Sequence, residues 1–305
     1  MIDKLEFLLA LARERHFTRA AEACNVTQPT LSAAIKQLED TLGVLLVVRG
    51  VRFQGFTPEG LRVLDWARRV VGDVRGMRDE VQAMRRGELT GHLRIAVVPT
   101  ALAVAAQLTT PFRRRHPGAR FTILSRTSIE ILGLLANLDI DAGITYLENE
   151  PVGKVRTVPL YAERYRLVVA ADHPLGARSH VAWRDVASVP LCLLTPDMQN
   201  RRIIDALLAA TGVERAPPSL ESDSMIVLFS HIRDGNWAGI MPAAFIDLMG
   251  VADRVRAIPI IEPTASQLIG LIVPDREVQT PLSTALIAEA QRMASRRDRQ
   301  ILAGR

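Results

Sequence analysis

Residues 27–42 read TQPTLSAAIKQLEDTL and combine a helix start with an apolar stripe. Thr27 is a residue type that caps helices, and Pro29 is tolerated in a first helical turn because its missing N–H has no partner there. The stripe recurs at helical spacing and consists of Leu31, Ile35, Leu38 and Leu42. Short polar groups at a helix N-terminus are typical of a recognition helix in the major groove of DNA. Here the face opposite the stripe carries Gln28, Thr30, Ser32, Ala33 and Lys36.

Two shorter helices are predicted before this segment. Residues 2–15 place apolar side chains at helical spacing between charges, namely Leu5, Leu8, Leu9 and Ala12. Phe17 marks a short break, and Thr18 is expected to cap an alanine-rich helix over residues 19–24. Asn25 and Val26 then form a tight turn. Three such helices also occur in purely structural domains, so the DNA-binding hypothesis depends on the elements that follow.

A wing is predicted after the third helix. Residues 44–53 are expected to form a short β-hairpin that carries Arg49 and Arg52. The two guanidinium groups are expected to meet phosphates or the minor groove beside the recognition helix. Residues 57–59, Thr-Pro-Glu, then supply a cap, a proline at the first helical position and an acid in the first turn of a fourth helix.

Four sequence blocks lie close together in this part of the chain. They are FTRAAE at 17–22, TQPTLS at 27–32, IKQLE at 35–39 and FTPEG at 56–60. In this order they resemble the DNA-binding domain of LysR-type transcriptional regulators, and the remainder of the chain follows the plan of that family. The resemblance implies a bacterial, sequence-specific regulator of transcription. Its DNA contacts are then expected at Thr18, Thr27, Gln28, Pro29, Thr30, Ser32, Lys36, Arg49 and Arg52.

The chain also departs from the family pattern. Long polar side chains usually follow the serine of the recognition helix, whereas Ala33 and Ala34 stand there in this chain. A phenylalanine is common in the family where Leu46 stands, and an arginine where Val48 stands. The two alanines leave the readout of bases to Gln28, Pro29, Thr30, Ser32 and Lys36.

The fourth helix is predicted to be long. Residues 57–86 contain no proline after Pro58, and their apolar residues alternate steps of four and three. This heptad seam consists of Val63, Ala67, Val70, Val74, Met77, Val81 and Met84. A seam of period 3.5 on an exposed helix predicts pairing with another copy, and the alternative is an ordinary helix packed on its own domain. The resemblance implies a linker helix in a homodimer or homotetramer that delivers two recognition helices to an inverted-repeat operator.

From residue 91 onward the pattern changes to strands alternating with helices, which predicts an α/β domain with a mostly parallel sheet. The first set comprises strands 92–98, 121–125 and 142–146 with helices 100–116 and 128–138. The second set comprises strands 165–170, 191–194, 238–241 and 268–273 with helices 201–211, 225–234, 243–249 and 282–297.

The fold class expected for the whole chain is therefore α/β, in three parts. An N-terminal winged helix-turn-helix covers residues 1–60, and a linker or dimerisation helix covers residues 57–87. A bilobed effector-binding domain covers residues 91–305, and the resemblance implies a fold like that of periplasmic binding proteins. Lobe I is expected over 91–160 and 268–305, lobe II over 161–267, with crossovers near 161 and 267.

A small-molecule site is predicted at the ends of the strands. Ligands of open α/β sheets bind beyond the carboxyl ends of the strands, and helix N-termini there favour anions. The residues at these ends that form the candidate site are Thr100, Ala101, Thr127, Ser128, Tyr146, Gln199 and Asn200. For any one threonine or serine, helix capping is the alternative role. A small carboxylate is the expected effector: formate is the first candidate, because the chain resembles family members beside formate dehydrogenase operons, and an aromatic acid is the alternative.

Composition excludes several other classes. The chain of 305 residues is 48% hydrophobic and 23% charged, with a net charge of +5, which indicates globular domains and only weakly favours polyanions. Two cysteines far apart argue against disulfides and zinc, and the N-terminus does not resemble a signal peptide. Enzyme motifs are absent and the six histidines are scattered, so no catalytic residue, metal or cofactor is expected. A solute-binding protein is the other alternative, but it predicts a signal peptide and no helix-turn-helix. We expect a cytoplasmic protein with no membrane segment.

Overall fold

A computed structural model of the chain describes residues 1–48, 50, 53–86, 88–148, 155–214, 217–235, 237–250 and 254–303. It divides the chain into two compact units. One contains Met1–Glu88, Ala136–Asp139 and Arg276–Pro281, and the other contains Leu89–Leu135, Ile140–Asp275 and Leu282–Arg305. The predicted boundaries of the DNA-binding domain, the linker and the two lobes remain predictions.

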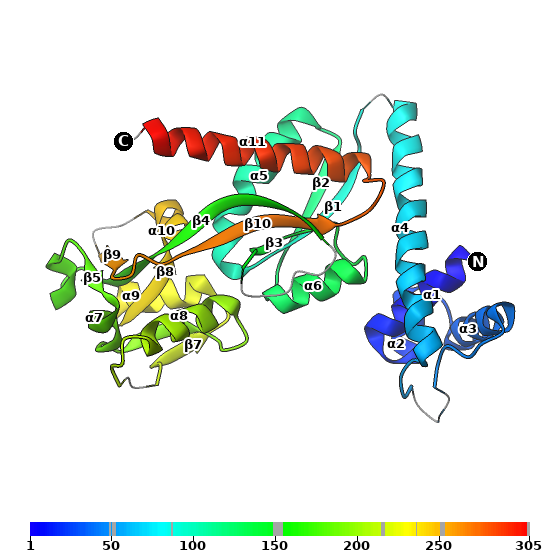
Figure 1. The fold of residues 1–305 in the computed structure, drawn as a ribbon, viewed down its shortest axis with the longest axis horizontal. Coiled ribbons are helices and arrows are strands. Elements are labelled where there is room, and N and C mark those ends of the chain that lie inside the picture. Colours follow the sequence, from blue (N-terminus) through cyan, green and yellow to red (C-terminus); the bar gives the residue numbers. More distant parts are fainter. Residues whose placement is uncertain are drawn as a thin grey trace. The chain divides into compact units, whose positions relative to one another are not determined.

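The N-terminal unit consists of four helices (Figure 1): α1 (Ile2–Glu14), α2 (Phe17–Ala23), α3 (Gln28–Leu42) and α4 (Pro58–Arg86). The prediction that Thr27 caps α3 is confirmed, because its side chain accepts a hydrogen bond from the Thr30 amide at 3.4 Å. The predicted stripe is buried at Leu31, Ile35 and Leu38, in one core with apolar residues of α1, α2 and α4. The prediction is wrong for the last residue of the stripe. Leu42 is 43% exposed, because α3 ends there at the margin of the core.

The predicted start of the second helix is also wrong. α2 begins at Phe17, its N-cap is His16, and Thr18 lies inside the first turn with an exposed side chain. The break comes earlier, at Arg15, which adopts the left-handed conformation with φ 48°. The ring of Phe17 lies edge-on to that of Phe53, with centroids 6.3 Å apart. A residue with such a packing partner belongs to the folded core rather than to a break.

The described part of the wing begins later than predicted. Val47 and Phe56 form an isolated antiparallel bridge, and the Val48 amide donates to the Gly55 carbonyl at 3.0 Å, whereas Val44 and Leu45 form no strand. A side chain of α3 binds backbone amides at the start of the wing. The carboxylate of Glu39, itself 6% exposed, accepts hydrogen bonds from the amides of Leu46 at 2.8 Å and Val47 at 3.1 Å. The predicted wing residues Arg49 and Arg52 lie outside the described residues.

The long helix α4 begins as predicted, with Thr57 Oγ1 accepting a hydrogen bond from the Gly60 amide at 2.9 Å. Gly60 is required by a close approach, because a Cβ there would lie 2.1 Å from the Leu46 carbonyl oxygen. The heptad seam is confirmed only in part. Ala67 is buried in the unit's own core together with Leu64 and Val71, which the seam did not include. Val70, Met77 and Val81 are exposed, as a pairing surface requires, and the side chain of Met84 is outside the described part.

The second unit is built on one mixed sheet with the strand order β2-β1-β3-β10-β4-β8-β6-β7, and with β9 also paired to β4 and β5. The strands of the first half are β1 (Gly91–Val97), β2 (Ala119–Ser125) and β3 (Ala142–Tyr146), parallel to one another. Those of the second half are β5 (Val181–Ala182), β6 (Leu191–Leu194), β7 (Leu220–Ser222), β8 (Ala238–Pro242) and β9 (Val255–Ile261). The antiparallel pair β4 (Val155–Ala170) and β10 (Ser266–Pro274) lies between the two halves.

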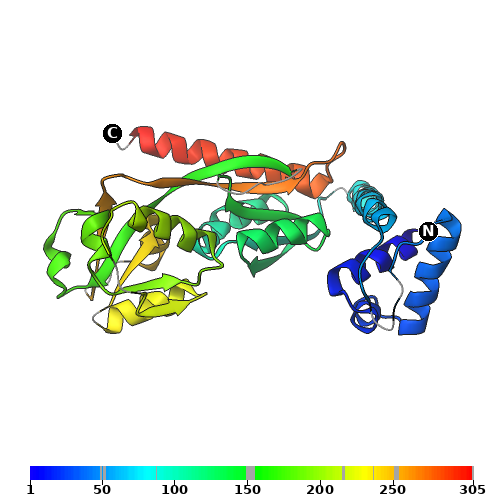
Figure 2. The same cartoon turned by 60° about the horizontal axis from the view of Figure 1, so that its bottom comes forward.

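Figures 1 and 2 show β4 and β10 side by side along the unit, with the last helix α11 (Pro281–Ala303) running alongside them. β4 pairs with β10 up to Arg164 and with β8 and β9 from Tyr165 onward. The helices are α5 (Leu102–Arg115), α6 (Ser128–Ala136), α7 (Trp183–Ala187), α8 (Gln199–Ala209), α9 (Met225–Asp234) and α10 (Ala243–Met249), with short 3₁₀ turns at η1 (Pro99–Ala101) and η2 (Pro174–Ala177). The predicted α/β alternation is confirmed, but the sheet is mixed rather than mostly parallel, because β4 and β10 run antiparallel to their neighbours. The elements β5, β7, β9 and α7 and the part of β4 before Tyr165 were not predicted.

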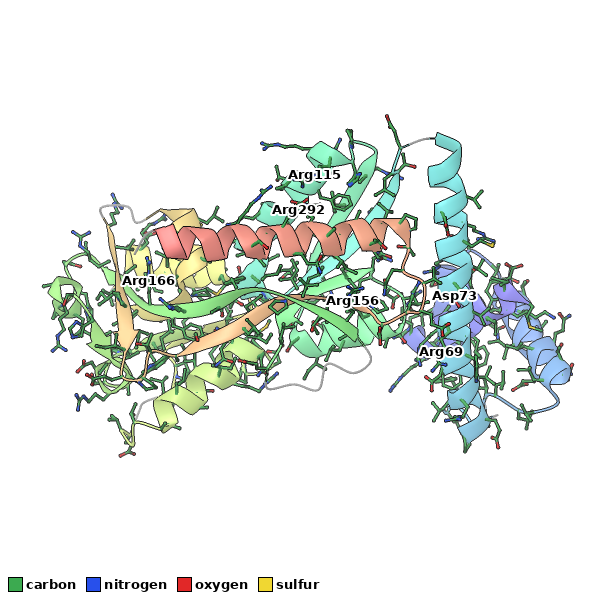
Figure 3. All side chains as sticks on the ribbon, turned by 45° about the horizontal axis from the view of Figure 1, so that its top comes forward. Arg69, Asp73, Arg115, Arg156, Arg166 and Arg292 are labelled. Atoms are coloured by element: carbon green, nitrogen blue, oxygen red, sulfur yellow. The ribbon has the colours of Figure 1, made fainter. Side chains whose placement is uncertain are left out.

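An ion cluster around one buried glutamate ties α11 to α5. Glu289 is 1% exposed, and it binds both Arg115 of α5 and Arg292 of its own helix, which lie close together in Figure 3. Within the described residues, no helix has the length and apolar character needed to cross a membrane.

We expect Glu39→Gln to loosen the wing. A neutral amide makes weaker hydrogen bonds than a carboxylate, so the local free energy of opening at Leu46 and Val47 should fall by about 1–2 kcal/mol. Hydrogen exchange of those two amides measures the change. Asp40→Asn, at an exposed position of the same helix, is the control. Equal protection in the two variants would contradict a positioning role for Glu39.

Candidate functional site

The exposed end of α3 presents the predicted DNA-contacting residues together. Gln28, Pro29 and Thr30 are exposed in its first turn, and Ser32 is half-buried one residue beyond Leu31. Thr27 is exposed too, but its hydroxyl is engaged, since Oγ1 lies 2.8 Å from Thr30 Oγ1 and also caps the helix. Pro29 has no backbone N–H, and the amides of Thr30 and Leu31 bond to Thr27, so the exposed side chain of Gln28 is the clearest donor that this turn presents to solvent.

Lys36 adds a positive charge on the exposed side of α3. Among the described residues, it forms no salt bridge, so its ammonium group is available to a phosphate. Thr18 is exposed on α2. The arrangement can therefore place short polar groups and one cation against a duplex groove, with Glu39 fixing the segment that follows.

The predicted effector residues converge on one cavity in the second unit. Thr100 comes from η1, Thr127 and Ser128 from the start of α6, Tyr146 from the end of β3, and Gln199 and Asn200 from the start of α8. The structure brings these six together; Val98, Pro99, Leu194 and Met198 complete the lining. Ala101 does not reach the cavity and packs in the main core instead. Both halves of the unit thus contribute to the site.

The cavity is small and rich in hydrogen-bond donors. Its free volume is about 10 Å³, room for roughly one water molecule. Ser128 Oγ and Asn200 Nδ2 are buried with no group at hydrogen-bonding geometry among the described residues, although Asn200 also acts on the buried phenol of Tyr165, lowering its pKa. Buried polar groups are nearly always paired, so two unpaired groups lining one cavity indicate a place for a polar ligand.

The N-termini of α6 and α8 differ in whether a side chain caps them. Thr127 caps α6 reciprocally with Glu130: the Glu130 amide donates to Thr127 Oγ1 at 3.2 Å, and the Thr127 amide donates to the Glu130 carboxylate at 2.8 Å. Its role as a cap, the alternative raised by the sequence, is therefore present. The N-terminus of α8 has no such side-chain cap. Gln199 accepts a hydrogen bond from Arg202 through its amide oxygen, which leaves the amide NH₂ as its donor.

A buried carboxyl lies behind the cavity wall. Thr100 Oγ1 is 2.8 Å from Tyr146 OH, and Tyr146 OH donates to Glu163 Oε1 at 2.9 Å. Burial raises the pKa of Glu163 to about 7, although its hydroxyl donors act in the opposite direction. Burial also raises the pKa of Tyr146, which therefore stays protonated.

Sequence reasoning missed Glu163 and its neighbours. A signal was present, because Tyr161, Glu163 and Tyr165 alternate along β4 and so share one face of the strand. A glutamate between two tyrosines on a face that packs inward is a candidate for a buried polar network. The contacts of that face with β3 and η1 depend on strand pairings that the sequence does not display.

Neither thiol belongs to the site. Cys24 lies on the core of the N-terminal unit, and Cys192 packs among apolar residues of β6 and α9. Burial raises the pKa of Cys192 to about 11, which suppresses the reactive thiolate. Nor do the residues described here contain a cluster of three metal-ligating side chains.

Comparison with known proteins identifies the family. Residues 2–61 match the model of the bacterial regulatory helix-turn-helix protein, lysR family, and residues 86–295 match that of the LysR substrate binding domain. A hydrogen peroxide-inducible genes activator of Pectobacterium carotovorum subsp. carotovorum is 30% identical over 273 residues, 89% of this chain and 89% of that protein. The DNA-binding transcriptional dual regulator OxyR of Escherichia coli K12 is also 30% identical over 273 residues, 89% of this chain and 88% of that protein.

A solved structure is similar to most of the chain. A full-length OxyR variant from Pseudomonas aeruginosa has a TM-score of 0.73 and 25% identity, covering 96% of this chain and 99% of that chain. The chain therefore belongs to the LysR family of transcriptional regulators, and it is a DNA-binding regulator with an effector domain rather than an enzyme. The relatives named here lend no support to the expected association with formate dehydrogenase operons.

Proposed function

We propose that the chain binds an inverted-repeat operator through α3 and the wing, in the cytoplasm where bacterial DNA lies, and that a small carboxylate in the cavity modulates this binding. The observation that carries the effector half is the pair of unpaired buried groups, Ser128 Oγ and Asn200 Nδ2, in a cavity that both halves of the second unit line.

The DNA half of the proposal assigns contacts to Thr18, Thr27, Gln28, Pro29, Thr30, Ser32, Lys36, Arg49 and Arg52. Exposure of the first turn of α3 and the unpaired charge of Lys36 support it. Side chains at the start of a recognition helix reach base edges, whereas cations farther along meet phosphates. With alanine at 33 and 34, the bases are read by a short surface around Gln28 and Thr30.

Lys36→Glu should weaken binding to DNA from upstream of the protein's own gene. Losing one phosphate contact reduces the slope of log affinity against log salt by about 0.9. A gel-shift series over several salt concentrations measures both effects. The matched control is Arg120→Glu, an equal charge reversal at an exposed position of β2. If the two variants lose the same affinity, only net charge matters and α3 does not contact the operator.

The protein acts as a dimer or tetramer in this proposal, paired through α4. Trp66, Val70, Met77 and Val81 are exposed at spacings of four, seven and four, and thus form one apolar stripe on α4. Arg69 and Asp73, both labelled in Figure 3, lie on the same stretch of helix. An exposed apolar stripe of this length is stabilised by a partner helix, and a second copy of the chain presents the same stripe.

Met77→Asp should therefore dissociate the pair, because it places a charge in the middle of the stripe. Light scattering at micromolar concentration measures the mass of wild type and variant. Val278→Asp introduces the same residue at a position 73% exposed and outside α4, and it should leave the mass unchanged. A monomeric wild type would overturn the dimer proposal.

A small anion fits the polarity of the cavity. Thr100, Ser128, Gln199 and Asn200 offer hydroxyl and amide donors, and the uncapped N-terminus of α8 adds backbone N–H groups and a partial positive charge. Formate or acetate would require a slight opening of the cavity, whereas an aromatic acid would require the halves of the unit to separate much further. The volume of about 10 Å³ therefore favours the smallest acids.

The names of the relatives raise peroxide as a second candidate ligand. Several relatives are hydrogen peroxide-inducible genes activators, and a molecule of that size also suits the cavity. Sensing by oxidation of a thiol requires an accessible thiolate, and Cys192 has a raised pKa in an apolar cluster. A small anion therefore explains the site better than thiol oxidation does.

Modulation follows from the two-sided cavity. A ligand held by Ser128 on one side and Asn200 on the other stabilises one arrangement of the two halves over another. It can shift DNA binding only by its difference in affinity between those arrangements, typically about 1–3 kcal/mol.

Ser128→Ala should weaken binding of the effector about tenfold, since it removes one hydrogen bond to an anion. Calorimetry with formate, acetate and benzoate, and with hydrogen peroxide as a separate arm, measures affinity. Ser125→Ala, at an exposed serine three residues away, is the control and should bind like wild type. If no acid releases heat, the effector half of the proposal is wrong.

A further inference from the structure

Glu163 is linked to the cavity through Tyr146, and the hydroxyl of Thr100 also acts directly on its carboxyl, lowering its pKa. Its carboxylate accepts from Tyr146 OH at 2.9 Å, and Tyr146 OH lies 2.8 Å from Thr100 Oγ1, which lines the cavity. Glu163 is 1% exposed and Tyr146 is 2% exposed. Solvent therefore does not interrupt this chain of three side chains.

The surroundings of Glu163 are polar but almost uncharged. Tyr161 on its own strand donates to Oε2 at 3.4 Å, and Tyr165 faces the carboxyl from two residues further along β4. On the neighbouring strand β10, Gln267 stands opposite in the pairing register. The titratable groups that face Glu163 are thus the phenols of β3 and β4, and among the described residues no Lys, Arg or His forms a salt bridge with it.

An ionised Glu163 dictates the direction of every hydrogen bond in the chain. A carboxylate can only accept, so Tyr146 must donate its one proton to Glu163. The Tyr146 oxygen is then left as an acceptor, and Thr100 donates to it. In this state Thr100 presents lone pairs to the cavity, which repel an anion.

A protonated Glu163 allows the reverse direction. Its acid proton can be donated to the Tyr146 oxygen, and Tyr146 can then donate to Thr100 Oγ1. The hydroxyl proton of Thr100 becomes free to turn into the cavity. Thr100 then offers a donor beside Ser128 Oγ and Asn200 Nδ2, which suits an anion.

We propose that Glu163 is a positioning residue for the effector: acting through Tyr146, it sets whether Thr100 offers a proton or a lone pair, so that an anion enters the cavity together with a proton taken up by Glu163. This inference rests on the proposed anionic effector. The proton comes from the buffer, and no covalent bond changes.

The sign of the pH dependence follows. Glu163 in the free protein has a pKa of about 7, and a bound anion that favours the protonated form raises this pKa further. Below the free-state pKa, the affinity is independent of pH. Above it, the affinity falls by up to about tenfold per pH unit, until the pKa of the complex is reached.

Calorimetry of the full chain with formate or acetate tests the inference. Titrations in buffers of different ionisation enthalpy, at about one pH unit above and below the free-state pKa, count the protons taken up on binding. We expect uptake approaching one proton per bound acid at the higher pH and little at the lower. Glu163→Gln should bind the acid with no proton uptake and no dependence on pH over this range.

Two phenylalanine variants separate a hydrogen-bond relay from simple charge repulsion between Glu163 and the ligand. Tyr146→Phe breaks the relay but keeps the ring and the carboxyl, and it should abolish proton uptake. Tyr161→Phe removes a hydrogen bond to Glu163 that is not part of the relay and leaves the relay intact. It should keep the uptake and move its onset to higher pH, because the lost donor had lowered the pKa of Glu163.

Each outcome is decisive. Uptake that survives in Tyr146→Phe shows that Glu163 acts without Tyr146, by charge repulsion or by its direct contact with Thr100, and overturns the relay. An acid that binds wild type without proton uptake overturns the relay but leaves the proposed effector in place. If no acid binds at all, both the effector proposal and this inference fail.

Discussion

The antiparallel pairing of β4 with β10 is the contact on which the effector unit depends. β4 runs from one half of the unit into the other and exchanges β10 for β8 and β9 at Tyr165. The continuous strand β4 limits how far the halves can move apart, and one hydrophobic cluster includes residues of both halves. The carboxyl ends of β1, β2 and β3 therefore face the start of α8 across a narrow gap, and this gap becomes the cavity.

Polar groups in such a gap are costly when they remain unpaired. An unsatisfied buried donor costs about 1–3 kcal/mol, and Ser128 and Asn200 each contribute one. A fold that retains two of them in one cavity is less stable than an apolar version would be, and a ligand that pairs with both recovers part of that energy. The same groups that weaken the free protein thus supply affinity, which is the thermodynamic basis for coupling the effector to the arrangement of the two halves.

Much of this arrangement could be predicted from sequence, where the signal is local. The apolar pattern located α9 at Met225–Asp234 and α10 at Ala243–Met249 to the residue, and the rule for strand ends selected six residues that line the cavity. Two strands were not predicted because their sequences carry little strand signal. β7 has only three residues, and β9 contains Pro259, which argues against a strand. Thr18 was misplaced because capping preferences cannot register the packing of Phe17 on Phe53, a contact between residues far apart in the chain.

Two buried glutamates show what sequence patterns cannot convey. Glu39 and Glu163 are both almost fully buried, yet one accepts from two backbone amides and the other only from hydroxyl groups. Backbone amides are fixed donors, so Glu39 can serve only as an acceptor that holds the start of the wing against α3. Hydroxyl groups can donate or accept, so the environment of Glu163 tolerates either protonation state, and its pKa of about 7 lies where both are populated. The difference lies entirely in the partners, which come from other strands and turns and become neighbours only in the folded chain.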